Sequence, residues 1–176
     1  MGNQSYLIDS QVTEVSYAEP VTLAETKTYL RVSHPSEDAQ IATMISAARR
    51  IIEDAAGLSI IQKSVKIWFS NMGGWFQLPF GPIVSSVTLY DETTNTILTD
   101  TTIIGGNHKI VKFPKIDSLR AEYLVGYSYV PVGLKYAILD QVNHMYENRG
   151  AFQDHTGICE KSWRACQQFK RVSPIL

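Results

Sequence analysis

The sequence predicts an α+β protein: a small helical bundle with an inserted, mostly antiparallel β unit and a C-terminal docking tail. Three observations predict this fold class. Apolar residues recur at helical spacing over about 37–56, side chains alternate with a period of two within 59–127, and a helical pattern returns over about 132–149. A period near 3.6 places apolar side chains on one face of a helix, whereas a period of two places them on one face of a strand.

The first two helices have clear boundary signals. Thr22 and Glu25 form the pattern of a capping box, which starts a short helix over about 23–31. Glu37 and Asp38 then fall in the first turn of the second helix, over about 37–56, where carboxylates favour the positive end of the helix dipole. Gly57 offers a left-handed C-cap. The apolar stripe of this helix consists of Ile41, Met44, Ile45, Ala48, Ile51, Ile52 and Ala55.

The last predicted helix of the bundle begins after Pro131 and ends at Gly150. Its apolar stripe is formed by Leu134, Ala137, Ile138, Val142 and Met145. This stripe is the expected partner of the faces that the first two helices present, since an amphipathic helix must bury its apolar side against another element.

The segment between the helices alternates like a half-buried sheet. Val65, Ile67 and Phe69 occupy one side of a predicted strand, and Trp68 falls on the other. Turns are expected at 91–95 and 105–107, with further strands over 109–113 and 119–125. Because Trp68 makes the second face partly apolar, the strand either lies in a two-sided core or turns one face to a neighbouring subunit.

The expected organisation has three parts. These are an N-terminal arm (1–20), a central domain (21–150, with helices at about 23–31, 37–56 and 132–149 and the β insertion at about 59–127) and a C-terminal tail (151–176). The arm shows no periodicity and ends at Pro20. The segment 92–115 has no assigned role.

Composition and charge narrow the function classes. The chain has 176 residues, of which 44% are hydrophobic and 19% charged, so a soluble globular protein with a real core is expected. A formal net charge of -1 gives no support for bulk attraction to nucleic acid or to an anionic membrane. The uncharged stretch 67–90 is interrupted by glycines and prolines, and no membrane helix is expected there.

The sequence predicts no catalytic residue, cofactor site or metal site. Gly126–Val130 approaches a nucleophile elbow but lacks the second glycine, and the Gly-Gly pairs at 73–74 and 105–106 are interpreted as turns. His144 and Glu147 lie one helical turn apart, but a metal needs further converging ligands. Cys159 and Cys166 lie two helical turns apart and are interpreted as buried thiols on one helix face.

The tail carries the candidate partner-binding residues. Aromatic and arginine side chains dominate the energies of many interfaces, and the tail ends with an apolar tip. The predicted binding residues are Trp163, Arg164, Phe169, Arg171, Ile175 and Leu176. Two alternatives stay open: the tail clasps a partner and orders on docking, or it forms a helix folded back on its own bundle.

Four ordered blocks of residues resemble a known family. Leu23–Val32 (LAETKTYLRV) is similar to the opening helix of the head-to-tail connector (adaptor) proteins of tailed bacteriophages. Glu37–Ile41 matches the acidic start of their second, alanine-rich helix. Leu78–Val87 (LPFGPIVSSV) resembles a segment of the longer, β-containing branch. The final-helix segments Pro131–Leu139 and Tyr146–Arg149 (YENR) complete a resemblance that covers about 20–150.

The resemblance implies a structural role without catalysis. Such proteins form a ring, dodecameric in characterised relatives, beneath the portal of the DNA-filled head. The implied partners are further copies of the chain, the portal protein and a downstream neck, stopper or tail protein, with genomic DNA passing through the channel without sequence-specific binding and with no membrane contact. The implied location is the head-tail junction of the virion, and the host cytoplasm during assembly. The alternatives are a head-completion stopper, a tail terminator or a DNA-packaging-associated protein.

Overall fold

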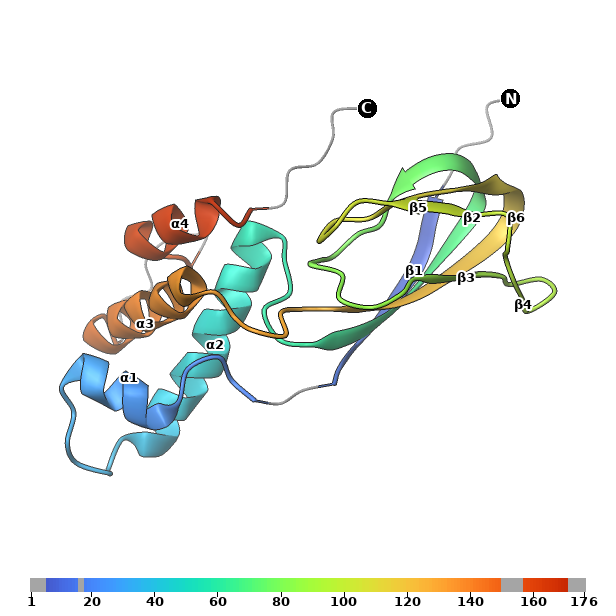
Figure 1. Cartoon of the computed structure of the whole chain (residues 1–176). Coiled ribbons are helices and arrows are strands. Elements are labelled where there is room, and N and C mark those ends of the chain that lie inside the picture. The colour runs from blue at the N-terminus through green and yellow to red at the C-terminus, as the bar shows by residue number, and fades with distance from the viewer. Residues whose placement is uncertain (1–5, 16–17, 150–156, 171–176) are drawn as a thin grey trace. The chain divides into compact units, whose positions relative to one another are not determined.

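The computed structural model describes residues 6–15, 18–149 and 157–170, and of Tyr6 only the backbone. Two compact units make up the chain, and their segments alternate along the sequence (Figure 1). The β unit comprises Met1–Tyr17 and Ile61–Ser128, and the helical unit comprises Ala18–Ile60 and Tyr129–Leu176. The predicted α+β class is confirmed, with four helices and six antiparallel strands in the described residues.

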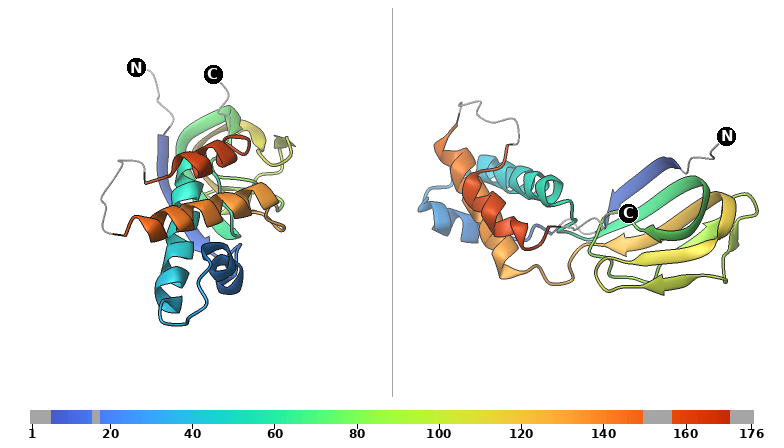
Figure 2. Two further views of the ribbon diagram at one scale, coloured as in Figure 1. Left: turned by 90° about the vertical axis from the view of Figure 1, so that its left-hand side faces the viewer. Right: turned by 90° about the horizontal axis from the view of Figure 1, so that it is seen from above.

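The helical unit is built from α1 (Leu23–Leu30), α2 (Asp38–Ala56), α3 (Val132–Glu147) and α4 (Glu160–Gln167). Helices α3 and α4 lie side by side across α2 (Figure 2). The predicted stripes of α2 and α3 form the core, in which the fully buried side chains include Ile41, Ile52, Leu134, Ile138 and Val142. Burying such side chains contributes roughly 1.5–3 kcal/mol each relative to leaving them exposed.

The boundary signals at Thr22 and Gly57 act as the sequence predicts, whereas α3 ends at Glu147, with Asn148 as its C-cap, before the predicted end at Gly150. Thr22 accepts the Glu25 amide at 3.1 Å, and the Glu25 carboxylate accepts the Thr22 amide at 2.7 Å, so the capping box is complete. Gly57 ends α2 in the left-handed conformation, with φ of +65°.

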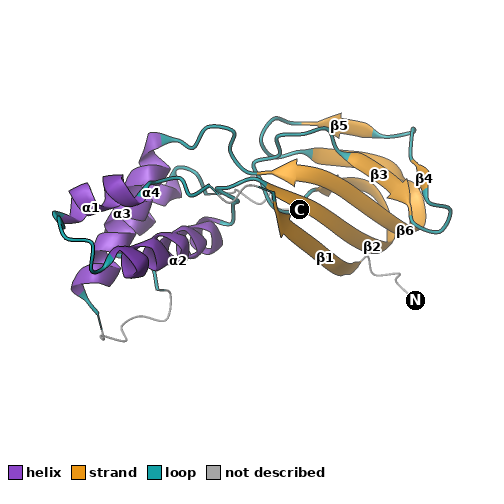
Figure 3. Ribbon diagram, turned by 90° about the horizontal axis from the view of Figure 1, so that it is seen from below, coloured by secondary structure: helices purple, strands orange, loops and turns teal. Residues whose placement is uncertain are grey.

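The β unit is one curled sheet with the strand order β1-β2-β6-β3-β4, to which β5 is added on β6 (Figure 3). Its long strands are β2 (Lys63–Gln77) and β6 (Ile110–Val125). The other strands are β1 (Tyr6–Glu14), β3 (Thr88–Asp91), β4 (Thr96–Ile97) and β5 (Thr102–Ile104). One long central pair is therefore flanked by the nine-residue β1 on one side and by much shorter strands on the other.

The register of the sheet explains the alternation seen in the sequence. Val65, Ile67 and Phe69 of β2 lie opposite Tyr123, Ala121 and Leu119 of β6, and all six side chains are buried. Trp68 lies opposite Arg120 on the other face, as predicted, and is half-buried. We call the first face the core side of the sheet and the second its outer side.

The segment 1–20 was expected to be an arm without periodic structure, but its described part contains a strand. Residues Tyr6–Glu14 form β1, which pairs with β2 along its length. The pairing shifts at Ile8, between Leu7 opposite Phe69 and Asp9 opposite Trp68. This bulge puts one extra residue into the strand, so the period of two is broken in the sequence although the strand is present.

The expected turn at Gly73-Gly74 is also different in the structure. Both glycines lie inside β2, and the register of β2 against β6 shifts between Met72 and Gly74. A Cβ at Gly73 would lie 2.7 Å from the Cα of Lys115, so the two backbones approach more closely than a side chain permits.

The tail expected over 151–176 is helical in its described part. Helix α4 packs against α3, which is the fold-back arrangement that the sequence left open. The described tail residues thus belong to the helical unit.

Candidate interaction surfaces

Helix α4 is fixed to α3 by polar groups as well as by apolar packing. The buried amide of Gln141 donates to the Gly157 carbonyl at 2.6 Å and accepts the Cys159 amide at 2.8 Å. The hydroxyl of Ser162, also buried, donates to the Ala137 carbonyl at 2.7 Å. Cys166 is fully buried beneath the helix, and burial raises the pKa of its thiol. The inner side of α4 therefore serves the fold.

The outer side of α4 carries part of the predicted partner-binding set. Trp163 is exposed, and the Lys170 amine lies 5.2 Å from the centre of its ring. Arg164 is exposed and pairs with Glu160 of the preceding turn. Phe169 is half-buried, and its ring would lie 3.2 Å from a Cβ at Gly133, so it packs on the start of α3. Arg171, Ile175 and Leu176 lie outside the described residues.

A groove runs between α1 and α3 on the helical unit. Its volume is about 840 Å³, and its wall includes the exposed side chains of Tyr29, Val132 and Tyr136. The Tyr29 hydroxyl donates to Asp140 at 2.7 Å, and this hydrogen bond raises the pKa of Tyr29 to about 12. The sequence did not single out this groove, because its two walls come from segments about a hundred residues apart.

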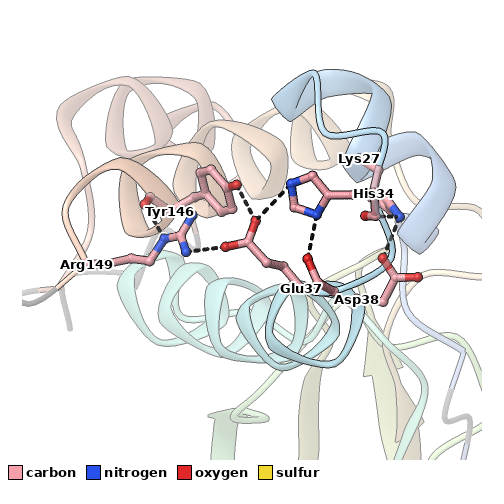
Figure 4. A network of polar contacts seen from close by, with 7 residues as sticks. Lys27, His34, Glu37, Asp38, Tyr146 and Arg149 are labelled. Carbon is pink, nitrogen blue, oxygen red and sulfur yellow. Dashed lines mark hydrogen bonds and ion pairs between the residues drawn. The ribbon is translucent and has the colours of Figure 1, made fainter.

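The family-like motifs on α1, α2 and α3 meet in one polar cluster (Figure 4). The Glu37 carboxylate accepts the Tyr146 hydroxyl at 2.6 Å and pairs with Arg149 at 2.5 Å, while Lys27 pairs with Asp38. The hydrogen bond from Tyr146, followed by that from Arg149, lowers the pKa of Glu37. We call these five residues the polar clamp. Because they bond to one another, these motif residues tie the start of α2 to α1 and to the end of α3.

Gly126, which directly follows β6, also serves the fold. Gly126 has φ of +107°, a backbone conformation that side chains disfavour. A Cβ at this position would lie 2.2 Å from the Ile61 carbonyl oxygen. The chain therefore leaves β6 by a turn that requires glycine.

The outer side of the sheet carries an aromatic and ionic patch. The Arg120 guanidinium lies 4.4 Å from the centre of the Tyr90 ring and pairs with Glu92 at 2.6 Å. The Trp68 indole donates to the same carboxylate at 3.2 Å. These contacts join polar groups of the face to one another, and the half-buried Trp68 is covered in part by its own neighbours.

The two margins of the sheet expose apolar side chains. On β1 and just after it, these are Leu7, Ile8, Val12 and Val15, and on β4 and β5 they are Ile97, Ile103 and Ile104. Sequence reasoning missed both sets. The first set lies on β1 and just after it, where the bulge interrupts the period of two. The second set lies in the segment 92–115, to which the sequence assigned no role.

The described residues contain no group of three or more histidine, cysteine and acidic side chains placed to hold a metal ion. His144 and Glu147 line a shallow pocket together with Asp140 and Cys159. Among the described helices, none combines the length and the apolar composition that crossing a bilayer requires.

The fold is that of an α+β protein with two compact units. Its sheet exposes apolar side chains at both margins. Comparison with protein-family models matches residues 19–157 to the family described as head completion protein. The match covers well over half of the chain, and the chain therefore belongs to this family. It is a structural protein of the head-tail junction of a phage-like particle, as the resemblance of its motifs implied. The match begins after β1 and ends before α4.

Solved structures of gene transfer agent (GTA) particles have a similar fold. The neck of an empty GTA particle computed with C6 symmetry gives a TM-score of 0.72 at 16% identity, covering 94% of this chain and 97% of that chain. The virion of a native GTA particle gives a TM-score of 0.71 at 19% identity, covering 93% of this chain and 97% of that chain. The neck of a native GTA particle computed with C12 symmetry gives a TM-score of 0.66 at 17% identity, covering 94% of this chain and 97% of that chain. A search of curated proteins gave no match.

Proposed function

We propose that the chain is the connector (adaptor) subunit of a phage-like particle. In this function, copies of the chain form a ring beneath the portal and join the DNA-filled head to the neck or tail. The observation that carries the proposal is the match of the chain to the head completion family together with a fold shared, over nearly its whole length, with chains of GTA necks. The C6 and C12 symmetries of those necks favour a cyclic assembly for this chain as well.

The charge of the chain suits the wall of a DNA channel. Strong binding to DNA requires many lysine and arginine contacts to phosphates, and it would hold the genome rather than let it pass. The chain has 16 basic and 17 acidic residues. In the structure many of them pair with one another, as Lys66 does with Glu122 and Arg120 with Glu92. We infer that DNA passes without sequence-specific binding and that the chain has no catalytic task.

The helical unit is the proposed portal-binding part. Trp163 and Arg164 on the outer side of α4 point away from the packed side that Ser162 and Cys166 form. The remaining predicted anchors, Arg171, Ile175 and Leu176, come after α4 in the sequence. A downstream neck, stopper or tail protein is the proposed partner on the side of the ring away from the portal.

Removal of the gene from the producing genome tests the function. The expected result is heads that contain portal and DNA but carry no tails, because the joining ring is missing. Supplying the wild-type chain from a plasmid should restore tailed particles. Tailed particles in normal number without the chain would overturn the proposal, and a chain found in particles at a position beyond the first neck ring would make it a stopper or tail terminator instead.

A further inference from the structure

The sheet of the β unit has one margin that is built differently from the other. Strand β1 is nine residues long and, among the described strands, pairs only with β2. The opposite margin consists of β4, with two residues, and β5, with three. Long edge strands present a row of backbone donors and acceptors that can pair with another chain, and soluble proteins ordinarily keep such edges short or charged.

The long margin also exposes apolar side chains. Leu7 is 53% exposed, Ile8 59% and Val12 42%. Leu7 and Val12 lie opposite Phe69 and Val65, so they stand on the core side of the sheet, where the next strand inward is fully packed. The apolar layer of the β unit therefore continues onto β1 and is left uncovered there.

The opposite margin has matching properties. Ile103 of β5 lies opposite the buried Val111 and so stands on the core side, 39% exposed. Ile104 of β5, 46% exposed, follows it along the strand. On the outer side of the sheet, Lys112 of β6 is exposed beside β5, whereas β1 exposes Asp9 on its outer side. The two margins thus share apolar core sides and carry opposite charges on their outer sides.

A closed ring requires two different and complementary surfaces on every subunit, because each copy contacts its neighbours head to tail. We propose that these surfaces are the two margins of the sheet: β1 of one copy packs edge to edge against β5 of the next. The sheet then extends from subunit to subunit, Leu7 and Val12 cover Ile103 on the core side, and Asp9 approaches Lys112 on the outer side. This inference rests on the proposed ring and names the contact that closes it.

Cysteine cross-linking in purified particles tests the contact. Ser10 is exposed on the core side of β1 and lies midway between Leu7 and Val12, so Ser10→Cys together with Ile103→Cys places one thiol on each margin. With a short bis-maleimide, the double variant should give a ladder of covalent multimers up to the copy number of the ring. Each single variant, and wild-type particles that contain only Cys159 and Cys166, should give no ladder.

The other possible arrangements give different results. Covalent dimers from Ser10→Cys alone would show that two β1 edges pair with each other, and bands joining Ser10→Cys to another neck protein would show that β1 binds that protein; both overturn the proposal. A ring visible by electron microscopy in double-variant particles that yield no ladder also overturns it, while the proposed function stands. Wild-type particles that lack the ring altogether would overturn both the assigned contact and the proposed function.

Lysine substitutions provide a second and independent measurement. Val12→Lys places a charge on the apolar margin, and the matched control is Val84→Lys, because Val84 is 41% exposed and Val12 42%. The expected result is loss of the ring in Val12→Lys with unchanged melting, and normal rings in Val84→Lys. A folded Val12→Lys chain that enters rings in the wild-type amount would contradict the assigned contact.

Discussion

The helical unit and the β unit use their residues for different purposes. In the helical unit, the polar clamp and the buried amide of Gln141 are satisfied within the unit, and the apolar stripes of α2 and α3 cover each other. In the β unit, the core is equally well packed around Phe69, but the apolar layer runs out to β1 and remains exposed. Motif residues typical of a family can therefore carry the fold, while the surface that we propose for assembly lies in segments without a motif.

The largest difference between the two units is expected for charges placed on apolar positions. Ile138→Asp and Ile45→Asp each put an unpaired carboxylate into the helical core and should destabilise it by roughly 3–5 kcal/mol. Ile97→Asp, at a side chain 58% exposed on β4, should change the free energy of unfolding by no more than about 0.5 kcal/mol. Urea unfolding of the three variants measures this, and an unchanged Ile138→Asp would show that the helix faces are assigned wrongly.

Two truncations separate the folded part of the tail from its predicted anchors. Deleting 157–176 removes α4 with the buried Cys166 and the partners of Gln141, and should lower the melting temperature of the helical unit clearly. Deleting only 171–176 should leave melting unchanged but weaken binding to portal-bearing heads. Thermal unfolding and co-sedimentation with such heads are the measurements. If the chain that lacks only 171–176 still attaches fully to portal-bearing heads, Arg171, Ile175 and Leu176 are not binding residues.

The polar attachment of α4 to α3 depends on Gln141. Gln141→Leu keeps a similar volume but leaves the Gly157 carbonyl and the Cys159 amide without their partner. The expected loss is roughly 1–3 kcal/mol in the free energy of unfolding, since unsatisfied buried groups cost that much. The exposed Gln167, on the outer side of α4, gives the control Gln167→Leu, for which no comparable loss is expected. Equal stability of both variants would show that α4 is held by apolar contacts alone.

The smallest effect is expected for the polar clamp, which lies at the surface. The clamp lowers the pKa of Glu37 below its ordinary 4.5, so its contribution to stability is present above that pH and is lost as the pH falls through the lowered value. Glu37→Gln should therefore be less stable than wild type at neutral pH, and the difference should narrow below pH 4.5. Glu147→Gln, an exposed carboxylate on the same helix as Tyr146, is the control. A difference that is constant with pH would exclude the ionised clamp as its cause.

The sequence predicted elements whose signals are local. The signals of the capping box at Thr22, of the stripe of α2 and of the alternation of Val65 and Ile67 with side chains of the other face all depend on neighbours within a few residues. The structure has each of these features. Strand β1 was missed because the bulge at Ile8 interrupts its period. The strands within 92–115 were missed because β4 and β5 are short and are fixed by pairing with distant residues, as Ile103 is with Val111.

The candidate surfaces were predicted less completely for the same reason. Trp163 and Arg164 were singled out because aromatic and arginine side chains are visible in the sequence, and both are exposed on α4, but their role in partner binding stays a prediction. Phe169 has the same residue chemistry, yet it packs on Gly133, a contact between segments far apart in the chain. The exposure of Leu7 and Ile103 likewise depends on which strand lies at which margin, and this order is a property of the whole sheet.

A cryo-electron microscopy reconstruction of the neck in particles that carry this chain tests the central claim most directly. We expect a ring directly beneath the portal with one copy per portal subunit, in which the β1 margin of each copy faces the β5 margin of the next. A single copy would contradict the ring, and a position elsewhere in the particle would contradict the connector function. A ring closed by other surfaces would contradict the assigned contact.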